Sequence, residues 1–525
     1  MTETAETQLD TLEEKGLVKL ATVRPELEYL FRHALVQDAA YGSLLKQERR
    51  ELHGQVGEAL EALYPDRVGE LAPVLAMHFE QAGETTKAID YYAAGGQHAL
   101  EQNAIQEAYG AFGQAAALIA GAPGSAVAQT APTAPASPEE AQRRRRQRIE
   151  VQLGRAQAGY TFLSADESLP ALEALVTEAD EFGDLDLVAR VHQLIALGRL
   201  QAGAQPSDPT VARSLQRITE VGEALGDPSI RAMPLAFVGL SQVFSGPIRD
   251  GVAALEEAVP LMQEQRDSIG AAFARGGLAI GYATLGEFEK ADAAVENAKQ
   301  IAKDGDLIAQ LDALIAESMV RATEGRLDQA MPLAQECVDR AEATGASACI
   351  MVSSWILGDA FHQLGRYAEA RDVLKRGADV ALAVDRQVWR PTLQAWLRTS
   401  SAALGEVQEV DSGEALATAR AIGNHMGEAG ILGKRAEVAA QEGHTDAAIA
   451  DFAAAADILA SEGARPVLAR VLRSWGEALR AAGRPDDGGS VLRKALALFE
   501  ELGLEREAAI VRTMLSLGGV NLALG

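Results

Sequence analysis

The chain has 525 residues, of which 48% are hydrophobic and only 5% aromatic, and its formal net charge is −27 at pH 7. This length exceeds one ordinary globular core, so several domains or a repeat array are expected. The acidic excess repels phosphate backbones and anionic lipid surfaces, and we therefore expect neither nucleic acid nor membranes as partners.

The two cysteines, Cys337 and Cys349, are too few for a disulfide framework, which favours a reducing compartment. The first ten residues, MTETAETQLD, lack the basic and apolar regions of a secretory signal. No run of 18 apolar residues occurs, so no membrane span is expected. Together these absences predict a cytoplasmic location.

Residues 1–64 differ in pattern from the rest of the chain. In order, the expected elements are a helix around Leu9–Lys15, a β-hairpin within 17–31 that turns at Arg24-Pro25, and helices over about 34–46 and 49–63. Helices followed by a β-hairpin are typical of a winged-helix fold, of which only the last part is present here. We interpret residues 1–64 as a winged-helix remnant with its connecting helices.

The next segments divide by composition. Residues 65–119 have the pattern of the first helical hairpins, and 120–140 are rich in Ala, Pro, Ser, Thr and Gly, which predicts a flexible linker. A helix is expected to open at Pro138 and to carry the basic run Arg143–Arg148, which we interpret as a solvated face. Irregular helical repeats follow over 141–245.

Regular repeats are predicted for residues 246–525 because glycines recur there at gaps of 38 to 40 residues. They are Gly246, Gly286, Gly325, Gly365, Gly405, Gly443 and Gly483. A fixed period in this range is typical of a solenoid of helical hairpins. Such an array presents an extended binding surface.

Columns of small residues follow each turn glycine. After the turn at Gly286, for example, come Ala291, Val295 and Ala298, at helical spacing that predicts one buried face. The corresponding positions after Gly405 include Glu414, and Arg398 stands where other units have a small residue, so the 387–423 unit is degenerate.

These patterns resemble the tetratricopeptide repeat family. The segments LGEFEKADAAVENA (285–298) and LGRYAEARDVLKRG (364–377) are similar to its motif of a glycine turn followed by alanine, a large apolar residue and a second small residue. HEAT-type repeats share the period near 40 but lack this pattern. The predicted fold is an all-α, tetratricopeptide-like solenoid.

A second resemblance lies at residues 28–60, where Phe31, His33, Tyr41 and His53 match the segment that joins the ATPase module to helical repeats in large bacterial signal-transduction ATPases. These proteins are often fused to a class III adenylate or guanylate cyclase. The resemblance implies a regulatory repeat region that relays binding to an ATPase or cyclase. The ATP site does not carry over, since the nearest string, GEAGILGKR (427–435), has Glu428 in place of the first glycine and belongs to a helix.

The sequence offers no catalytic, cofactor-binding or metal-binding constellation, so we expect a non-enzyme without a cofactor. None of the eight histidines pairs at i,i+4 spacing or lies beside a cysteine at metal-ligand spacing. His33 and His53 are expected to pack between the hairpin and the helices. Cys337 occupies a small-residue column and is expected in the core.

A binding groove is predicted along the first helices of the repeats. Its outward positions, counted back from each turn, are Asp359, His362, Glu437, Arg470, Arg473, Glu477 and Arg480. The three arginines suit a carboxylate-bearing peptide, whereas Arg473 and Glu477 are also i,i+4 partners and could form an ordinary intrahelical pair.

We therefore expect a non-catalytic interaction or sensor scaffold that takes a protein or peptide on its concave face. Two alternatives stay open. The chain could belong to an ATP-dependent adenylate or guanylate cyclase whose catalytic part lies outside it, or to a transcription regulator whose DNA-binding part lies outside it.

Overall fold

The fold is described from a computed structural model of residues 3–22, 28–102, 104–121, 137–159, 163–264, 268–303, 307–384, 388–406 and 412–516. The chain separates into two compact units, residues 1–158 and 159–525, each described by itself. The expected turn at Arg24-Pro25 and most of the expected linker, residues 122–136, lie outside the described residues. The five-part division of the sequence stays a prediction.

The first unit begins with a helix and an antiparallel hairpin. Strands β1 (Val18–Thr22) and β2 (Glu28–Phe31) pair Val18 with Phe31 and Leu20 with Tyr29, with an irregularity between Leu20 and Thr22. The expected β-hairpin is thus confirmed. Its assignment to a winged-helix remnant stays a prediction.

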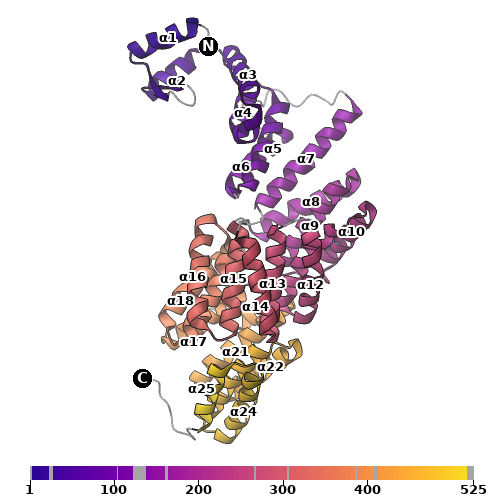
Figure 1. Cartoon of the computed structure of the whole chain (residues 1–525), viewed down its shortest axis with the longest axis vertical. Coiled ribbons are helices and arrows are strands. Elements are labelled where there is room, and N and C mark those ends of the chain that lie inside the picture. Colours follow the sequence, from indigo (N-terminus) through magenta and orange to yellow (C-terminus); the bar gives the residue numbers. More distant parts are fainter. Residues whose placement is uncertain are drawn as a thin grey trace. The chain divides into compact units, whose positions relative to one another are not determined.

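Helices make up the rest of the first unit (Figure 1). They are α1 (Glu3–Glu14), α2 (Ala34–Ser43), α3 (Lys46–Leu63), a short 3-10 helix (Pro65–Arg67), α4 (Val68–Ala82), α5 (Thr85–Glu101), α6 (Ile105–Ala120) and α7 (Pro138–Gly159). Helices α3 to α6 pack pairwise in chain order around a core that includes Leu75, Phe79 and Ile89. On α7, Arg144 and Arg146 pair with Glu140 and Glu150 at i,i+4, as an ordinary solvated face would.

The second unit is a series of helical hairpins, each packed on the next. After α8 (Ala165–Phe182) the pairs are α9 (Leu185–Gln201) with α10 (Pro209–Leu225), α11 (Ala232–Ser245) with α12 (Ile248–Glu264), α13 (Ser268–Leu285) with α14 (Phe288–Ala302), α15 (Leu307–Thr323) with α16 (Leu327–Thr344), α17 (Ser347–Gln363) with α18 (Tyr367–Ala383), α19 (Arg390–Ala403) with α20 (Ser412–Ala421), α21 (His425–Gln441) with α22 (Thr445–Glu462), and α23 (Arg465–Ala481) with α24 (Pro485–Glu501), followed by α25 (Glu505–Ser516).

Acidic caps begin two of the helices between residues 141 and 245. The Asp184 carboxylate accepts hydrogen bonds from backbone N–H groups in the first turn of α9, and Asp208 does the same for α10. Such caps satisfy amide groups that have no partner inside the helix. A 3-10 helix over Pro228–Arg231 connects α10 to α11.

The small-residue columns lie in the core, as predicted. Ala291, Val295 and Ala298 are fully buried, and the equivalent residues of most other units are buried as well. At Gly476 on α23, an added Cβ would lie 2.6 Å from Leu492 of α24, so only glycine permits this approach of the two helices. Together, the hairpins and their columns give an all-α, tetratricopeptide-like solenoid.

The degenerate unit departs from the predicted register. Glu414 and Ala417, expected on the buried face of α20, are exposed, and Ala415, Leu416 and Ala419 are buried instead. The prediction was wrong here because α20 begins only at Ser412 and spans ten residues, so its apolar face is shifted relative to the turn at Gly405.

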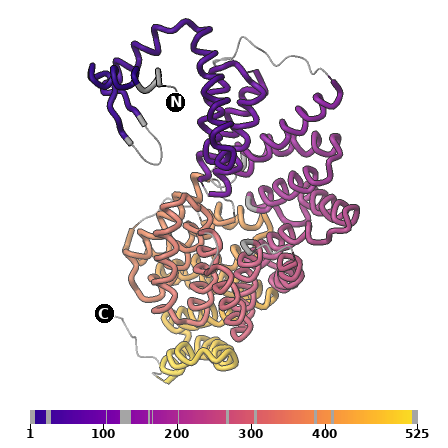
Figure 2. The backbone as a smooth tube through the Cα atoms, turned by 45° about the horizontal axis from the view of Figure 1, so that its top comes forward, coloured from indigo at the N-terminus to yellow at the C-terminus, as the bar shows by residue number. Residues whose placement is uncertain are grey.

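Later hairpins of the second unit fold back onto earlier ones. Helix α21 contacts α11 and α23 contacts α13, although about 200 residues separate them in sequence. Figure 2 shows the orange and yellow helices of this unit lying beside its magenta ones. The first helices of the hairpins therefore form an inner layer in which several of them meet.

Candidate functional site

The predicted groove positions lie on three first helices, α17, α21 and α23. Asp359, near the end of α17, accepts hydrogen bonds from the indole Nε1 of Trp396 and from the amide of Gln363, both at 2.7 Å. Above the same indole ring, 5.4 Å from its centroid, lies the ammonium group of Lys434 on α21. A cation over an indole face is attracted by the ring quadrupole.

Glu437 is at the centre of a group that we call the polar cluster. Its members are Asp359, His362, Trp396, Ser400, Lys434, Glu437, Arg470, Arg473 and Glu477. Its carboxylate is 3.1 Å from Lys434 Nζ and 3.6 Å from His362 Nε2, and His362 Nδ1 shares a hydrogen bond of 3.0 Å with Ser400 Oγ. Burial alone would raise the pKa of Glu437, but the charge of Lys434 and the contact with His362 lower it to about 2. For Lys434 burial acts in the opposite direction and would lower the pKa, but the charges of Glu437 and Asp359 raise it. The pair is therefore ionised at neutral pH.

Arg470 joins the cluster to an earlier hairpin. Its Nη2 donates to the backbone carbonyls of Thr323 at 2.6 Å and Ala322 at 3.2 Å, at the end of α15, and lies 3.4 Å from a carboxylate oxygen of Glu507. Burial lowers its pKa. The Arg470 guanidinium thus ties three helices together.

The other two arginines have different partners. Arg473 Nε lies 3.6 Å from Glu477, which confirms the intrahelical pair, and burial raises the pKa of Glu477. Arg480 donates to the backbone carbonyl of Met514 on α25. The three arginines of the predicted groove thus differ, since Arg470 and Arg480 donate to backbone carbonyls and Arg473 pairs with a half-exposed carboxylate.

Three members of the cluster were missed from the sequence. Lys434 lies in the segment 427–435, and Trp396 and Ser400 belong to the degenerate repeat 387–423, where Arg398 replaces the small residue of the motif. Glu437 at i+3 from Lys434 was the one available signal, because such residues are neighbours on a helix.

Beside the cluster, the inner layer is apolar. Phe244, Trp355, Trp389 and Trp396 form a chain of ring contacts with centroid separations of 5.0 to 5.9 Å. They line a cavity of about 110 Å³, and a larger one of about 170 Å³ follows among α9, α11, α13, α15 and α17. The inner layer therefore has a charged part and an aromatic part.

In the first unit, two residues of the second resemblance, Tyr41 and His53, form a chain of contacts with His78. Tyr41 Oη lies 3.0 Å from His53 Nε2, and His53 Nδ1 lies 3.0 Å from His78 Nδ1. Burial lowers the pKa of both histidines. His53 contacts Tyr41 of α2 and His78 of α4, whereas His33 is exposed at the start of α2.

Two further observations concern sites of other kinds. Across the described residues, no group of three or more metal-ligating side chains comes together. Among the described helices, none combines the length and the apolarity needed to cross a membrane. Cys337 is fully buried, as predicted, and its thiol donates to the backbone carbonyl of Leu311 at 3.8 Å.

Comparison with known proteins gives limited matches, and no protein-family model matches the chain. An uncharacterised protein of Rhizobium meliloti (strain 1021) is 30% identical over 99 residues, which are 19% of this chain and 10% of that protein. The chain thus spans about a tenth of the length of this relative.

Two solved structures align along much of the chain. One is a Rap protein complexed with competence and sporulation factor (TM-score 0.48, 13% identity, 68% of this chain and 98% of that one). The other is the APC/C hetero-tetramer Cut9-Hcn1 (TM-score 0.45, 13% identity, 92% of each chain). Both TM-scores are below 0.5, so the fold assignment rests on the hairpin geometry described above.

Proposed function

We propose that the second unit is a non-catalytic scaffold that binds a protein or peptide along its inner layer, at the polar cluster. The observation that carries this proposal is the convergence of Asp359, His362, Glu437, Arg473 and Glu477, which come from three helices. Charged groups held in one place by neighbouring first helices give a partner a fixed pattern to match.

Within the cluster, Arg473 and Glu477 are the best placed to contact a partner. Their pair is long at 3.6 Å, and the Glu477 side chain is 46% exposed. An incoming carboxylate could replace Glu477 on the Arg473 guanidinium and form two hydrogen bonds there. Arg470 and Arg480 donate to backbone carbonyls of other helices and would hold α23 in place rather than contact a partner.

A finer proposal is that the chain is the regulatory repeat region of a signalling ATPase or cyclase system. It rests on the resemblance at residues 28–60. An observation that favours it is that many large apolar side chains of residues 12–77 are exposed, Leu35 at 81% and both Leu45 and Leu63 at 69% among them. Apolar surface of this extent is typical of a region that contacts another domain or chain.

The test is affinity capture with the full chain, followed by mass spectrometry, with wild type compared with Arg473→Glu. A partner that wild type retains and Arg473→Glu loses supports the inner-layer site. Arg512→Glu on α25, which breaks an exposed pair with Glu500, is the matched charge-reversal control and should retain the partner.

A swapped double variant, Arg473→Glu with Glu477→Arg, sharpens the test because it keeps the ion pair but exchanges its ends. It should also fail to bind, since the partner reads the position of the positive charge. Retention of the same partner by Arg473→Glu would reject the proposed site. Loss by Arg512→Glu as well would show a nonspecific charge effect.

A further inference from the structure

The larger apolar cavity of the second unit has the size and lining of a small-molecule site. Its volume is about 170 Å³. A dry cavity of roughly 150 Å³ in another protein is large enough to bind benzene. Five first helices, α9, α11, α13, α15 and α17, contribute to its wall. The space therefore suits one compact aromatic molecule.

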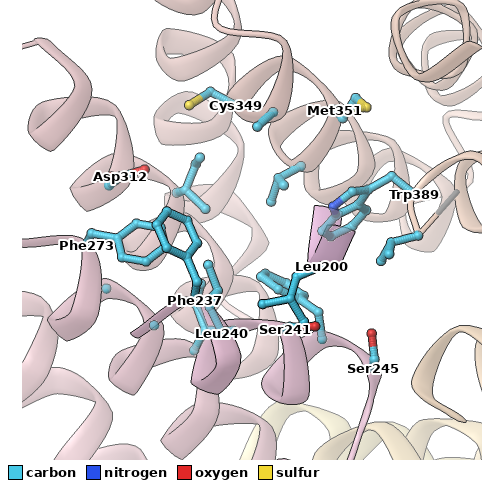
Figure 3. Close-up of a pocket in the computed structure, with 18 of the residues that line it drawn as sticks. Leu200, Phe237, Leu240, Ser241, Ser245, Phe273, Asp312, Cys349, Met351 and Trp389 are labelled. Atoms are coloured by element: carbon cyan, nitrogen blue, oxygen red, sulfur yellow. The ribbon is translucent and has the colours of Figure 1, made fainter. Parts of the chain in front are cut away.

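Aromatic side chains stand on opposite sides of the cavity. Figure 3 shows Phe237 and Phe273 on one side and Trp389 on the other, with Leu200 and Leu240 between them. The two phenylalanine rings are in contact, with centroids 4.7 Å apart. A flat ligand between these walls would gain ring–ring contacts in addition to burial of its apolar surface.

The polar groups of the lining restrict the charge of the ligand. Among the lining residues that the structure describes, Asp312 carries the only formal charge, and Ser241, Ser245 and the Cys349 thiol supply neutral polar atoms. A carboxylate at the wall repels an anionic ligand, most strongly where water is excluded. The exposed residue Ala348 places part of the lining at the surface.

We propose that this cavity binds a small, uncharged aromatic molecule of one or two fused rings, at a site separate from the polar cluster. It is independent of the proposed scaffold function, since none of its lining residues belongs to the cluster. Binding there would fill space between first helices of successive hairpins and thereby stabilise their packing.

Isothermal titration of the full chain with indole tests the proposal. We expect saturable one-to-one binding and a higher unfolding temperature in the presence of indole. In Ser241→Leu the added side chain occupies the cavity, so the affinity should fall about tenfold or more. Ser43→Leu, at an exposed position of the first unit, is the matched control and should bind as wild type does.

Circular dichroism must show that Ser241→Leu is folded, and the smaller Ser241→Val replaces it if it is not. Absence of indole binding to wild type, or unchanged binding by a folded cavity variant, would overturn the proposal. Equal affinity for indole-3-acetate would overturn the choice of an uncharged ligand. Equal affinity for N-acetyltryptophanamide would assign the cavity to a peptide side chain and overturn the small-molecule assignment.

These readouts do not depend on a protein partner. Indole binding with no effect of Arg473→Glu on any captured protein would leave the cavity proposal standing and reject the scaffold site. Absence of indole binding together with loss of a captured protein in Arg473→Glu would reject the cavity proposal and leave the scaffold site standing.

Discussion

The turns at Gly286 and Gly365 have the same place in the repeat but different surroundings. Both glycines end a first helix with similar left-handed backbone, φ 83° and 71°. At Gly286 an added Cβ would overlap the side chain of Leu502, whereas at Gly365 no heavy atom lies within 4 Å. Gly246 and Gly325 resemble the first case, covered by Glu462 and Glu507, and Gly405, Gly443 and Gly483 resemble the second.

This difference arises because later hairpins fold back onto earlier turns. The local requirement at each turn is a residue that tolerates positive φ, and it is the same throughout. Whether a side chain would fit at the covered turns depends on residues about 180 to 220 positions later in the sequence. Substitutions at equivalent positions of different repeats should therefore change the free energy of unfolding by different amounts.

The largest effect is expected at the buried pair that covers the turn at Gly325. Glu507, 6% exposed, lies against Arg470, and Glu507→Gln would remove the carboxylate charge that lies 3.4 Å from the guanidinium. Loss of one partner of such a pair costs about 4 kcal/mol. Urea unfolding should show this loss, and Glu500→Gln, which breaks an exposed pair with Arg512, should change the unfolding free energy by less than about 1 kcal/mol.

A smaller loss in Glu507→Gln than in Glu500→Gln would contradict the idea that this contact fastens later hairpins to earlier ones. Because repeat arrays can unfold in stages, hydrogen exchange should accompany the urea experiment. Amides at the end of α15 and in α25 should then lose the most protection.

The free energy of unfolding should depend on pH more strongly through the buried polar cluster than through the exposed ion pairs beside turns such as Gly365. The pKa of Glu437 is about 2, below its ordinary value of 4.5, so its contribution is present above pH 4.5 and is lost as the pH falls toward 2. A shift of this size corresponds to on the order of 3 kcal/mol. Glu437→Gln should therefore be less stable than wild type at pH 7, and the difference should shrink between pH 4.5 and 2.

Glu369, after the open turn at Gly365, is the control for this pH series. Its carboxylate pairs with Arg366, which lowers its pKa, but it is solvent-exposed. Glu369→Gln should follow the wild-type urea midpoint at every pH. If both variants behaved alike, burial of Glu437 would not be what matters.

The two turns themselves can be compared by alanine substitution. Gly365→Ala should cost about 1 kcal/mol, since only the strain of positive φ is added. Gly286→Ala adds the overlap with Leu502 and should cost about 2 kcal/mol in total. The double variant Gly286→Ala with Leu502→Ala relieves the overlap, so its deviation from additivity measures the contact. Equal costs at the two glycines would mean that Leu502 moves aside freely.

Local features of the fold were predictable from the sequence, and the contacts between distant hairpins were not. Glycine spacing and small-residue columns act within one hairpin, so their pattern gave the period and most of the buried faces. Arg470 was predicted as an outward groove position of α23, but its side chain is largely buried and donates to the carbonyls of Ala322 and Thr323, which lie 147 to 148 residues earlier. No periodic pattern encodes that distance.

The candidate site shows the same division. Asp359, His362 and Glu437 follow from counting along first helices, and the structure brings them together. Trp396 was not predicted, because the repeat to which it belongs is irregular and the buried face of its second helix, α20, is shifted. The apolar cavity was not predicted, since side chains such as Leu200, Phe237 and Trp389 belong to three different units and differ little in sequence from ordinary core residues.

The smallest effect on stability is expected from Arg473→Glu, although its effect on partner binding should be large. Its pair with Glu477 is long, with the Glu477 side chain 46% exposed, and a pair of this kind contributes about 0 to 1 kcal/mol. The variant places two carboxylates one helical turn apart, and burial already raises the pKa of Glu477. The unfolding free energy should therefore fall by no more than about 1 kcal/mol at pH 7, and by less as the pH is lowered, because protonation of Glu477 removes the repulsion. A fall as large as that of Glu507→Gln would show that Arg473, like Arg470, is a structural tie rather than a contact left for a partner.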